Sequence, residues 1–343
     1  MVLEVAIGLI FVYLLFSLFC SALSEIISWF INLRANTLHS GIETLLHDSA
    51  LPELIKQNTK LKAAFDKAST RWKQPEQNVV GTLYSHPLIQ GMVHDKKQPS
   101  HIPSHTFTAA FIDMLHSLAK TEASPADGLK KLRAAIANLP EQSEIRQQLD
   151  AVLDDTVRDA EEARSRVEKW FDDSMERVSG WYKRRAQVIV LAVAVLVVGV
   201  ANADSVMIVR SIARDSALRA GLVAASEQTV KAGPPETRTE PDIVKAAAQL
   251  QQTLTQINDL RLPIGWNFET EATIGRVPDP RNVPRTFSDW LGKLVGLVFT
   301  ILAVSMGAPF WFDILNKVVN ARLTGSPPPP KKEKKKEQEK EED

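Results

Sequence analysis

Three windows without any charged residue constrain the fold of this chain more than any other feature. They run from Val5 to Ser24, from Ala186 to Ala203 and from Leu294 to Phe312, and they are 20, 18 and 19 residues long. A helix of about 20 residues crosses the hydrocarbon core of a bilayer. The sequence therefore predicts an integral membrane protein with three transmembrane helices, for which the lipid bilayer is the first partner.

The first window is expected to be a retained anchor rather than a cleaved secretory signal. A signal carries basic residues before its apolar stretch, whereas the only charged side chain upstream of this window is Glu4. The single cysteine, Cys20, lies inside the window, which excludes an intramolecular disulfide. It also follows the large Phe19, where a lipidated cysteine would follow a small residue.

The windows predict an all-α chain with a helical cytoplasmic domain and a small outer helical hairpin. Only the first connecting segment is long enough to bury a core of its own. The expected order is a transmembrane helix over 1–31, the cytoplasmic domain over 32–185, a second transmembrane helix over 186–209, an outer hairpin with a proline-rich segment over 210–289, a third transmembrane helix over 290–318, and a disordered charged tail over 319–343.

The orientation is predicted from the cations that flank the windows. Arg34 follows the first window, Lys183 and its neighbours precede the second, and Lys317 follows the third, so an amino terminus outside and a carboxyl terminus in the cytoplasm place these edges on the cytoplasmic face. The opposing segment also holds arginines near both of its ends, including Arg210 and Arg285, which makes the charge bias moderate.

Aromatic, charged and small residues near the window edges are candidates for interface anchoring and helix packing. Tryptophan and tyrosine favour the headgroup level, and a Gly-xxx-Gly pair allows close contact between helices. Asp313 and Lys317 are spaced to pair on one helix. The candidates are Glu25, Trp29, Arg34, Trp181, Tyr182, Lys183, Arg184, Arg185, Gly292, Gly296, Trp311, Asp313 and Lys317.

Helical periodicity runs through the cytoplasmic segment. A helix is expected to begin near Ser104 or Thr106 and to bury Phe107 and Phe111 on one face. From about residue 141 an apolar stripe at three- and four-residue steps predicts one long amphipathic helix that enters the second window. The stripe either packs on its own domain or forms a self-associating coiled coil.

Four motifs resemble those of an uncharacterised family of bacterial multi-span inner-membrane proteins. They are HPLIQG at residues 86–91, IPSHTF at 102–107, WFDDSMERVSGWYKRR at 170–185 and GAPFWFD at 307–313. The resemblance implies a multi-pass protein of the bacterial inner (plasma) membrane and carries no assigned activity. The family pattern places an aromatic residue at position 101 and a cation at position 105, where this chain has histidines.

The sequence offers no convincing set of catalytic residues, cofactor ligands or metal ligands. Histidines 86, 94, 101, 105 and 116 cluster within about thirty residues, but their spacing matches no ligand motif. Equal numbers of basic and acidic residues, 41 of each, give no net charge to attract nucleic acid.

We therefore expect a non-enzymatic membrane anchor or scaffold whose cytoplasmic domain recruits a partner or oligomerises. An oligomeric channel or signalling effector gated by that domain is the alternative.

Overall fold

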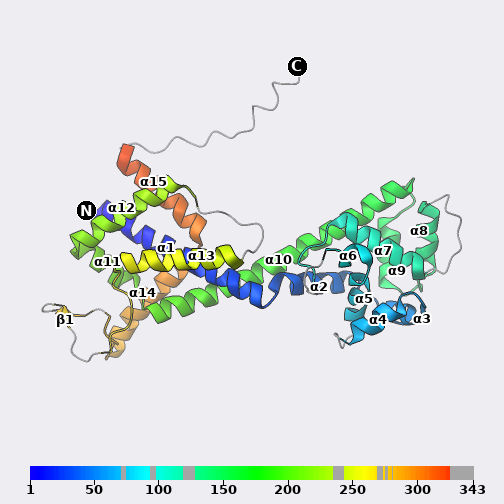
Figure 1. Ribbon diagram of the computed structural model, residues 1–343, viewed down its shortest axis with the longest axis horizontal. Coiled ribbons are helices and arrows are strands. Elements are labelled where there is room, and N and C mark those ends of the chain that lie inside the picture. The colour runs from blue at the N-terminus through cyan, green and yellow to red at the C-terminus, as the bar shows by residue number, and fades with distance from the viewer. Residues whose placement is uncertain are drawn as a thin grey trace, which may run out of the picture. The chain divides into compact units, whose positions relative to one another are not determined.

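The computed structural model describes residues 1–70, 75–92, 98–118, 128–234, 243–268, 273–274, 277–279 and 281–324. Contacts between residues divide the chain into two compact units (Figure 1). Residues 30–185 form one unit, which we call the helical domain, and residues 1–29 and 186–343 form the other, which we call the span unit. The sequence predicts boundaries at 31/32 and 185/186, and the contacts place them at 29/30 and 185/186.

The fold is all-α, as predicted, and every described element longer than two residues is a helix. The helical domain is built from nine helical segments among its described residues. They are α2 (Leu33–Leu45), α3 (Leu51–Gln57), α4 (Lys62–Ser69), α5 (Pro75–Tyr84), α6 (Pro87–Gln90), α7 (Ser104–Leu118), α8 (Gly128–Ala137), α9 (Glu144–Val152) and the first part of α10 (Ala160–Ala201).

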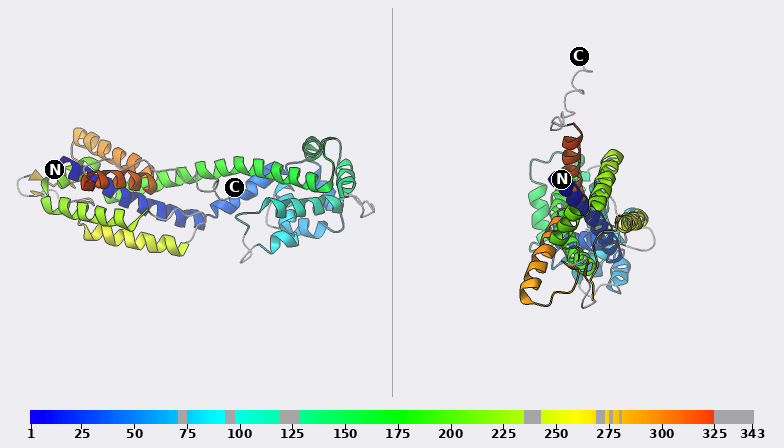
Figure 2. Two further views of the ribbon diagram at one scale, coloured as in Figure 1. Left: turned by 90° about the horizontal axis from the view of Figure 1, so that it is seen from above. Right: turned by 90° about the vertical axis from the view of Figure 1, so that its left-hand side faces the viewer.

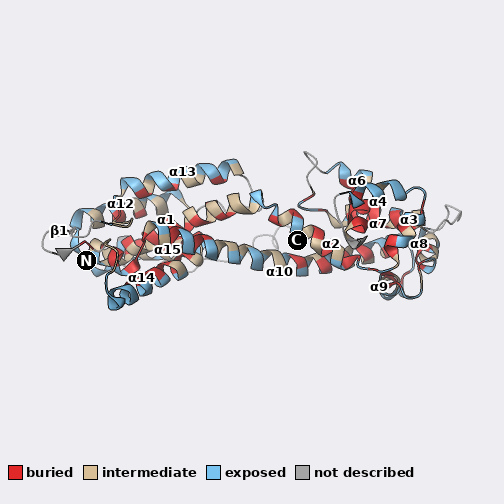
Figure 3. Ribbon diagram, turned by 90° about the horizontal axis from the view of Figure 1, so that it is seen from below, coloured by how far each residue is buried: buried red, intermediate tan, exposed pale blue. Residues whose placement is uncertain are grey.

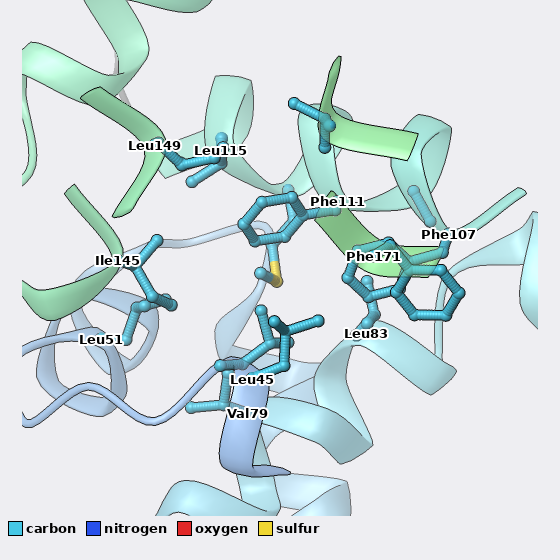
Figure 4. Packing of buried hydrophobic residues seen from close by; sticks show 14 of the residues in the cluster. Leu45, Leu51, Val79, Leu83, Phe107, Phe111, Leu115, Ile145, Leu149 and Phe171 are labelled. Atoms are coloured by element: carbon cyan, nitrogen blue, oxygen red, sulfur yellow. The ribbon is translucent and has the colours of Figure 1, made fainter. Parts of the chain in front are cut away.

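Stacked aromatic rings lie at the centre of the helical domain (Figure 4). The rings of Phe107 and Phe171 are 4.1 Å apart between centroids and nearly parallel, and Phe111 stacks on Phe107 at 5.5 Å. Aliphatic side chains from α2, α3, α5 and α9 surround them, and all are almost fully buried. Each such side chain contributes about 1.5–3 kcal/mol by leaving water. The predicted helix start at Ser104 and its buried phenylalanine face are confirmed.

The long amphipathic helix begins at Ala160, so the prediction of a continuous helix from about residue 141 is wrong. Between α9 and α10, the Asp154 carboxylate accepts hydrogen bonds from the backbone N–H and the hydroxyl of Thr156, and these bonds lower the pKa of Asp154. Asp159 then caps α10 by accepting from the N–H of Glu162. Short side chains that bond to nearby backbone compete with helix formation, although the apolar stripe continues through the break.

The apolar stripe of α10 is buried inside the helical domain. Ala163, Val167 and Phe171 are each at most 2% exposed and belong to the domain core. This arrangement corresponds to the expectation that the stripe packs on its own domain.

The span unit contains α1 (Val2–Phe30), the end of α10, α11 (Ser205–Arg214), α12 (Ser216–Ala232), α13 (Ile243–Asp259), α14 (Phe287–Ser305) and α15 (Ala308–Thr324). Helix α1 is the most buried of the three apolar helices, whereas α14 is largely exposed (Figure 3). Large apolar side chains are exposed on both α10 and α14. Gly8 of α1 is close to α11 and α12, because a Cβ atom there would lie 3.2 Å from Leu222 and 3.4 Å from Ile212.

The second apolar helix ends at Ala201, earlier than the predicted 209. Asn202 adopts a left-handed conformation with φ of 47°. Asp204 then caps α11 by accepting hydrogen bonds from the N–H groups of Val206 and Met207, at 2.8 and 3.3 Å. A left-handed residue followed by an N-cap ends one helix and begins the next, so the chain turns here.

The third apolar window is not one helix, so the prediction of a continuous span over 290–318 is also wrong. Helix α14 ends at Ser305, Gly307 has φ of 87°, and Pro309 lies in the first turn of α15. A positive φ suits glycine, and proline is tolerated in a first helical turn. Helix α15 returns alongside the first half of α1 (Figure 2), where the Trp311 and Tyr13 rings are 4.8 Å apart.

This return brings together two ends that the predicted topology separates. The guanidinium of Arg322 lies 3.4 Å from the Glu4 carboxylate and 2.9 Å from that of Glu227. The Arg219 guanidinium lies 3.5 Å from the other oxygen of the Glu4 carboxylate. The sequence predicts Glu4 and Arg322 on opposite membrane faces, whereas here they belong to one ion-pair network.

The segment after α13, which the sequence predicts only as proline-rich, contains a short two-stranded pairing. Strands β1 (Thr273–Ile274) and β2 (Val277–Pro278) pair antiparallel, and a bridge joins Asn267 to Asn282. The sequence predicts a disordered tail from residue 319, and this start is too early because residues 319–324 belong to α15. The rest of that prediction, over 325–343, lies outside the described residues.

Candidate functional site

Three of the predicted interface residues meet at one end of the helical domain. The Arg34 guanidinium carbon lies 6.0 Å from the centre of the Tyr182 ring, in a cation–π contact. Arg185 donates a long hydrogen bond of 3.5 Å to the hydroxyl of Thr37, which is itself buried and donates to the Leu33 carbonyl at 2.7 Å. Residues 148 positions apart in the sequence are therefore adjacent in this domain.

A close contact between α2 and α10 brings these side chains together. A Cβ atom at Gly41 would collide with both methyl groups of Val178, so only glycine allows this approach. Asn32, with φ of 49°, turns the chain between α1 and α2, and the Asn36 side chain closes the turn by donating to the Ile31 carbonyl at 2.9 Å. The glycine at position 41 thus allows α2 to lie directly against α10.

A cavity of about 420 Å³ lies beside this contact, and we call it the domain pocket. Its walls come from the start of α2, from residues 100–104 and from one face of α10. Apolar side chains form one part of the wall: Leu38, Ile102, Phe171, Met175 and Val178. The motifs IPSHTF and WFDDSMERVSGWYKRR both contribute to the wall, although they are far apart in the sequence.

Polar groups form the rest of the pocket wall. They are Arg34, Thr37, His101, Ser104, Ser179 and Tyr182, together with Ser100 and the acid Asp172. Lys183 and Arg184 follow directly on α10 and are exposed. The pocket therefore combines hydrogen-bond donors and positive charge with an apolar surface, a composition that suits a small amphipathic ligand.

The histidine cluster of the sequence is dispersed in the domain. His86 Nε2 lies 3.3 Å from an Asp113 oxygen, His101 lies at the domain pocket, and His94 lies outside the described residues. Partial burial lowers the pKa of His116, and the positive charge of Lys131 acts in the same direction. In the part of the chain that the structure describes, no three histidine, cysteine or acidic side chains gather as a metal site.

The two glycines of the predicted packing motif have different surroundings in the span unit. A Cβ atom at Gly292 would meet nothing within 4 Å, whereas one at Gly296 would collide with the Asp204 carboxylate. Asp204 also pairs with Lys293, whose ammonium is 3.7 Å away, and both side chains are buried. Gly296 thus makes room for a buried ion pair inside the chain.

The remaining predicted residues lie in varied surroundings. The Trp311 indole donates a 2.5 Å hydrogen bond to the Ala303 carbonyl across the Gly307 turn. Asp313 and Lys317 lie on α15 and are exposed, no ion pair joins them among the described contacts, and their pairing stays a prediction. Glu25 and Trp181 are half-buried, and Trp29 is 37% exposed.

Sequence reasoning missed the Asp204–Lys293 pair and the network around Glu4. Both join residues more than 80 positions apart, for which a single sequence gives no pairing signal. One local signal was present, because Asn202 and Asp204 stand just before an apolar-periodic segment, as turn and cap residues do.

The three apolar helices define the class of the molecule. Val2–Phe30, Ala160–Ala201 and Phe287–Ser305 are each long and apolar enough to cross a membrane. The large apolar side chains exposed on α10 and α14 suit contact with lipid, so the chain has the features of an integral membrane protein. Comparison with known protein families, curated proteins and solved structures finds no match.

Proposed function

We propose that this protein is a non-enzymatic membrane anchor whose helical domain recruits a protein partner or assembles with further copies of itself. The observation that carries the proposal is the division of the chain. Residues 30–185 have their own buried core and are inserted between two apolar helices, one ending at Phe30 and the other entering its apolar window at Ala186. Such a chain holds a folded domain at a membrane surface through two tethers.

The helical domain is proposed to face the cytoplasm of a bacterial inner membrane. Arg34 and the run from Lys183 to Arg185 stand at its two membrane connections, and cations beside spans favour the cytoplasmic side. The four sequence motifs support the bacterial assignment. The Glu4–Arg322 pair supports a single membrane face for these two residues, in place of the opposite faces expected from charge alone.

An oligomeric channel or signalling effector remains the second candidate, favoured by the apolar side chains that α10 and α14 leave exposed for another copy. Polar groups within the span unit weigh against a pathway through one protomer. Ser205 bonds to Tyr13 and to Thr300, at 2.7 Å each, and the Ser17 hydroxyl donates to the Val304 carbonyl at 3.1 Å. These side chains are engaged with one another rather than lining open space.

The test is affinity purification of the full-length protein in detergent, with mass spectrometry for companions and light scattering for oligomeric mass. Phe171→Asp places a charge in the core of the helical domain and leaves the apolar helices unchanged, whereas Asp173→Ala changes an exposed residue. We expect a companion or a self-assembled complex that Phe171→Asp loses and Asp173→Ala retains. Ion conductance by a purified, companion-free oligomer in vesicles would contradict the anchor and favour the channel.

A further inference from the structure

The domain pocket has the chemistry of a phosphate-binding site at its α2 end. The Arg34 guanidinium and the hydroxyls of Ser179 and Tyr182 are donors around one part of the cavity. A guanidinium bonds phosphate oxygens in a two-pronged geometry, and hydroxyls supply further donors. The one carboxylate in the wall, Asp172, precedes Tyr182 by ten residues, which places it about 15 Å away along α10.

The apolar part of the same pocket distinguishes between sources of phosphate. Leu38, Met175 and Val178 line the cavity beside the donors, and Ile102 and Phe171 extend this surface. Inorganic phosphate has no apolar part that would cover these side chains. A glycerophospholipid joins a phosphate to a glycerol ester and to hydrocarbon, so it satisfies both parts of the wall.

Chain connectivity places the pocket near bilayer headgroups. Arg34 follows the last residue of α1 by four positions, and Tyr182 precedes Ala186, where the second apolar window begins, by four. Tyrosine at such a position favours the interface. The adjacent lysine and arginines, 183–185, attract anionic lipid, because polybasic segments beside spans gather it from the bilayer.

We propose that the domain pocket binds an anionic glycerophospholipid. The phosphate lies between Arg34, Ser179 and Tyr182, and the glycerol ester covers Leu38 and Val178. Bound lipid thereby fastens α2 to α10 at the point where both connect to the apolar helices. The inference goes beyond partner recruitment and does not depend on it, since it requires only that the apolar helices lie in a bilayer.

The test is lipid binding to detergent-solubilised full-length protein, measured by native mass spectrometry with phosphatidylglycerol, phosphatidylcholine and inorganic phosphate as separate probes. Arg34→Gln removes the proposed phosphate ligand. Arg164→Gln is the matched control, because Arg164 is exposed on the same domain and is not part of the pocket wall. Ser179→Leu fills the cavity without changing any charge.

We expect phosphatidylglycerol to bind the unchanged protein and the Arg164 variant equally, and to bind Arg34→Gln and Ser179→Leu at least tenfold more weakly. If Arg34→Gln fails to fold, as shown by circular dichroism, Ser179→Leu carries the test. An equal loss in both arginine variants would mean non-specific attraction to charge and would overturn the proposal. Inorganic phosphate that binds as tightly as the lipid would overturn the lipid assignment and leave a free phosphate ligand.

Discussion

Two glycines on α14 provide a sharp test of the buried ion pair, because one substitution is applied at two positions on one helix. Gly292→Ala adds a methyl group where nothing lies within 4 Å. Gly296→Ala adds the same group against the carboxylate of Asp204, which must then move. Any general effect of alanine on α14 is shared by both variants, so their difference reports the local contact.

The expected magnitude follows from what the Asp204 carboxylate does. Moving it breaks the pair with Lys293, which is only 6% exposed, and removing one partner of a buried pair costs about 3–5 kcal/mol. It also removes the N-cap of α11, worth about 1 kcal/mol. Partial relaxation and the helix preference of alanine, about 1 kcal/mol, offset part of this. We expect Gly296→Ala to lower the free energy of unfolding by about 2–4 kcal/mol.

The assay is thermal unfolding of the purified protein in detergent, followed by tryptophan fluorescence. Trp266 and Trp290 are 6.3 Å apart, and the Lys293 ammonium lies 5.4 Å from the Trp266 ring, so the signal includes the affected region. At roughly 2–4 °C for each kcal/mol, the midpoint should fall by about 4–16 °C in Gly296→Ala. It should rise by about 2–4 °C in Gly292→Ala, because the helix preference of alanine there meets no steric cost.

A double-mutant cycle completes the test. In a background of Asp204→Ala, the methyl group at Gly296 meets no carboxylate, so Gly296→Ala should then cost little. Equal midpoints for the two glycine variants, or an undiminished loss in the Asp204→Ala background, would refute the reasoning.

Three further outcomes are expected. Gly41→Ala should destabilise the helical domain by about 1–3 kcal/mol through overpacking against Val178, whereas Gly180→Ala, where the added methyl group meets nothing within 4 Å, should stabilise it slightly. Urea unfolding of the full-length protein, followed by pulse proteolysis, measures both changes. Equal effects of the two substitutions would contradict the contact between Gly41 and Val178. Burial lowers the pKa of His116, so the unfolded chain binds a proton at this residue more readily than the folded chain as the pH falls below about 6.5. The unfolding midpoint should therefore drop between pH 7.5 and pH 5.5, and it should drop less in His116→Asn. The same pH dependence in both proteins would exclude this role for His116. Accessibility reporters fused to the two chain ends should report the same membrane face, and opposite faces would contradict the return of α15 along α1.

Periodicity and composition predicted the helices more successfully than their ends. The three apolar helices and the start of α7 at Ser104 followed from windows and cap residues that act locally. The break before Ala160 was missed because Leu153 and Val157 keep the apolar stripe in phase, while the signals for the break are the short side chains of Asp154 and Asp159. A single side chain that competes with the helix for backbone hydrogen bonds contributes little to a periodicity averaged over many residues.

The candidate site was predictable in its parts and not in its assembly. Arg34 and Tyr182 stood out because cations and aromatic rings mark the edges of apolar windows. Their contact with each other, and the contribution of residues 100–104 to the same cavity, depend on tertiary packing across long stretches of chain. The turn at Gly307 was similarly hidden, because an apolar window does not record backbone dihedral angles.

The pairing of Glu4 with Arg322 has a consequence for biosynthesis. A ribosome releases α1 first and α15 last among the described helices, so the Glu4–Arg322 pair forms only after α15 has been made. Residues 30–185, with a core of their own, are complete much earlier and are free to fold during translation. Truncation before α15 would then leave an assembled domain attached to an unfinished membrane part, a species that quality-control proteases would recognise by the uncovered face of α1.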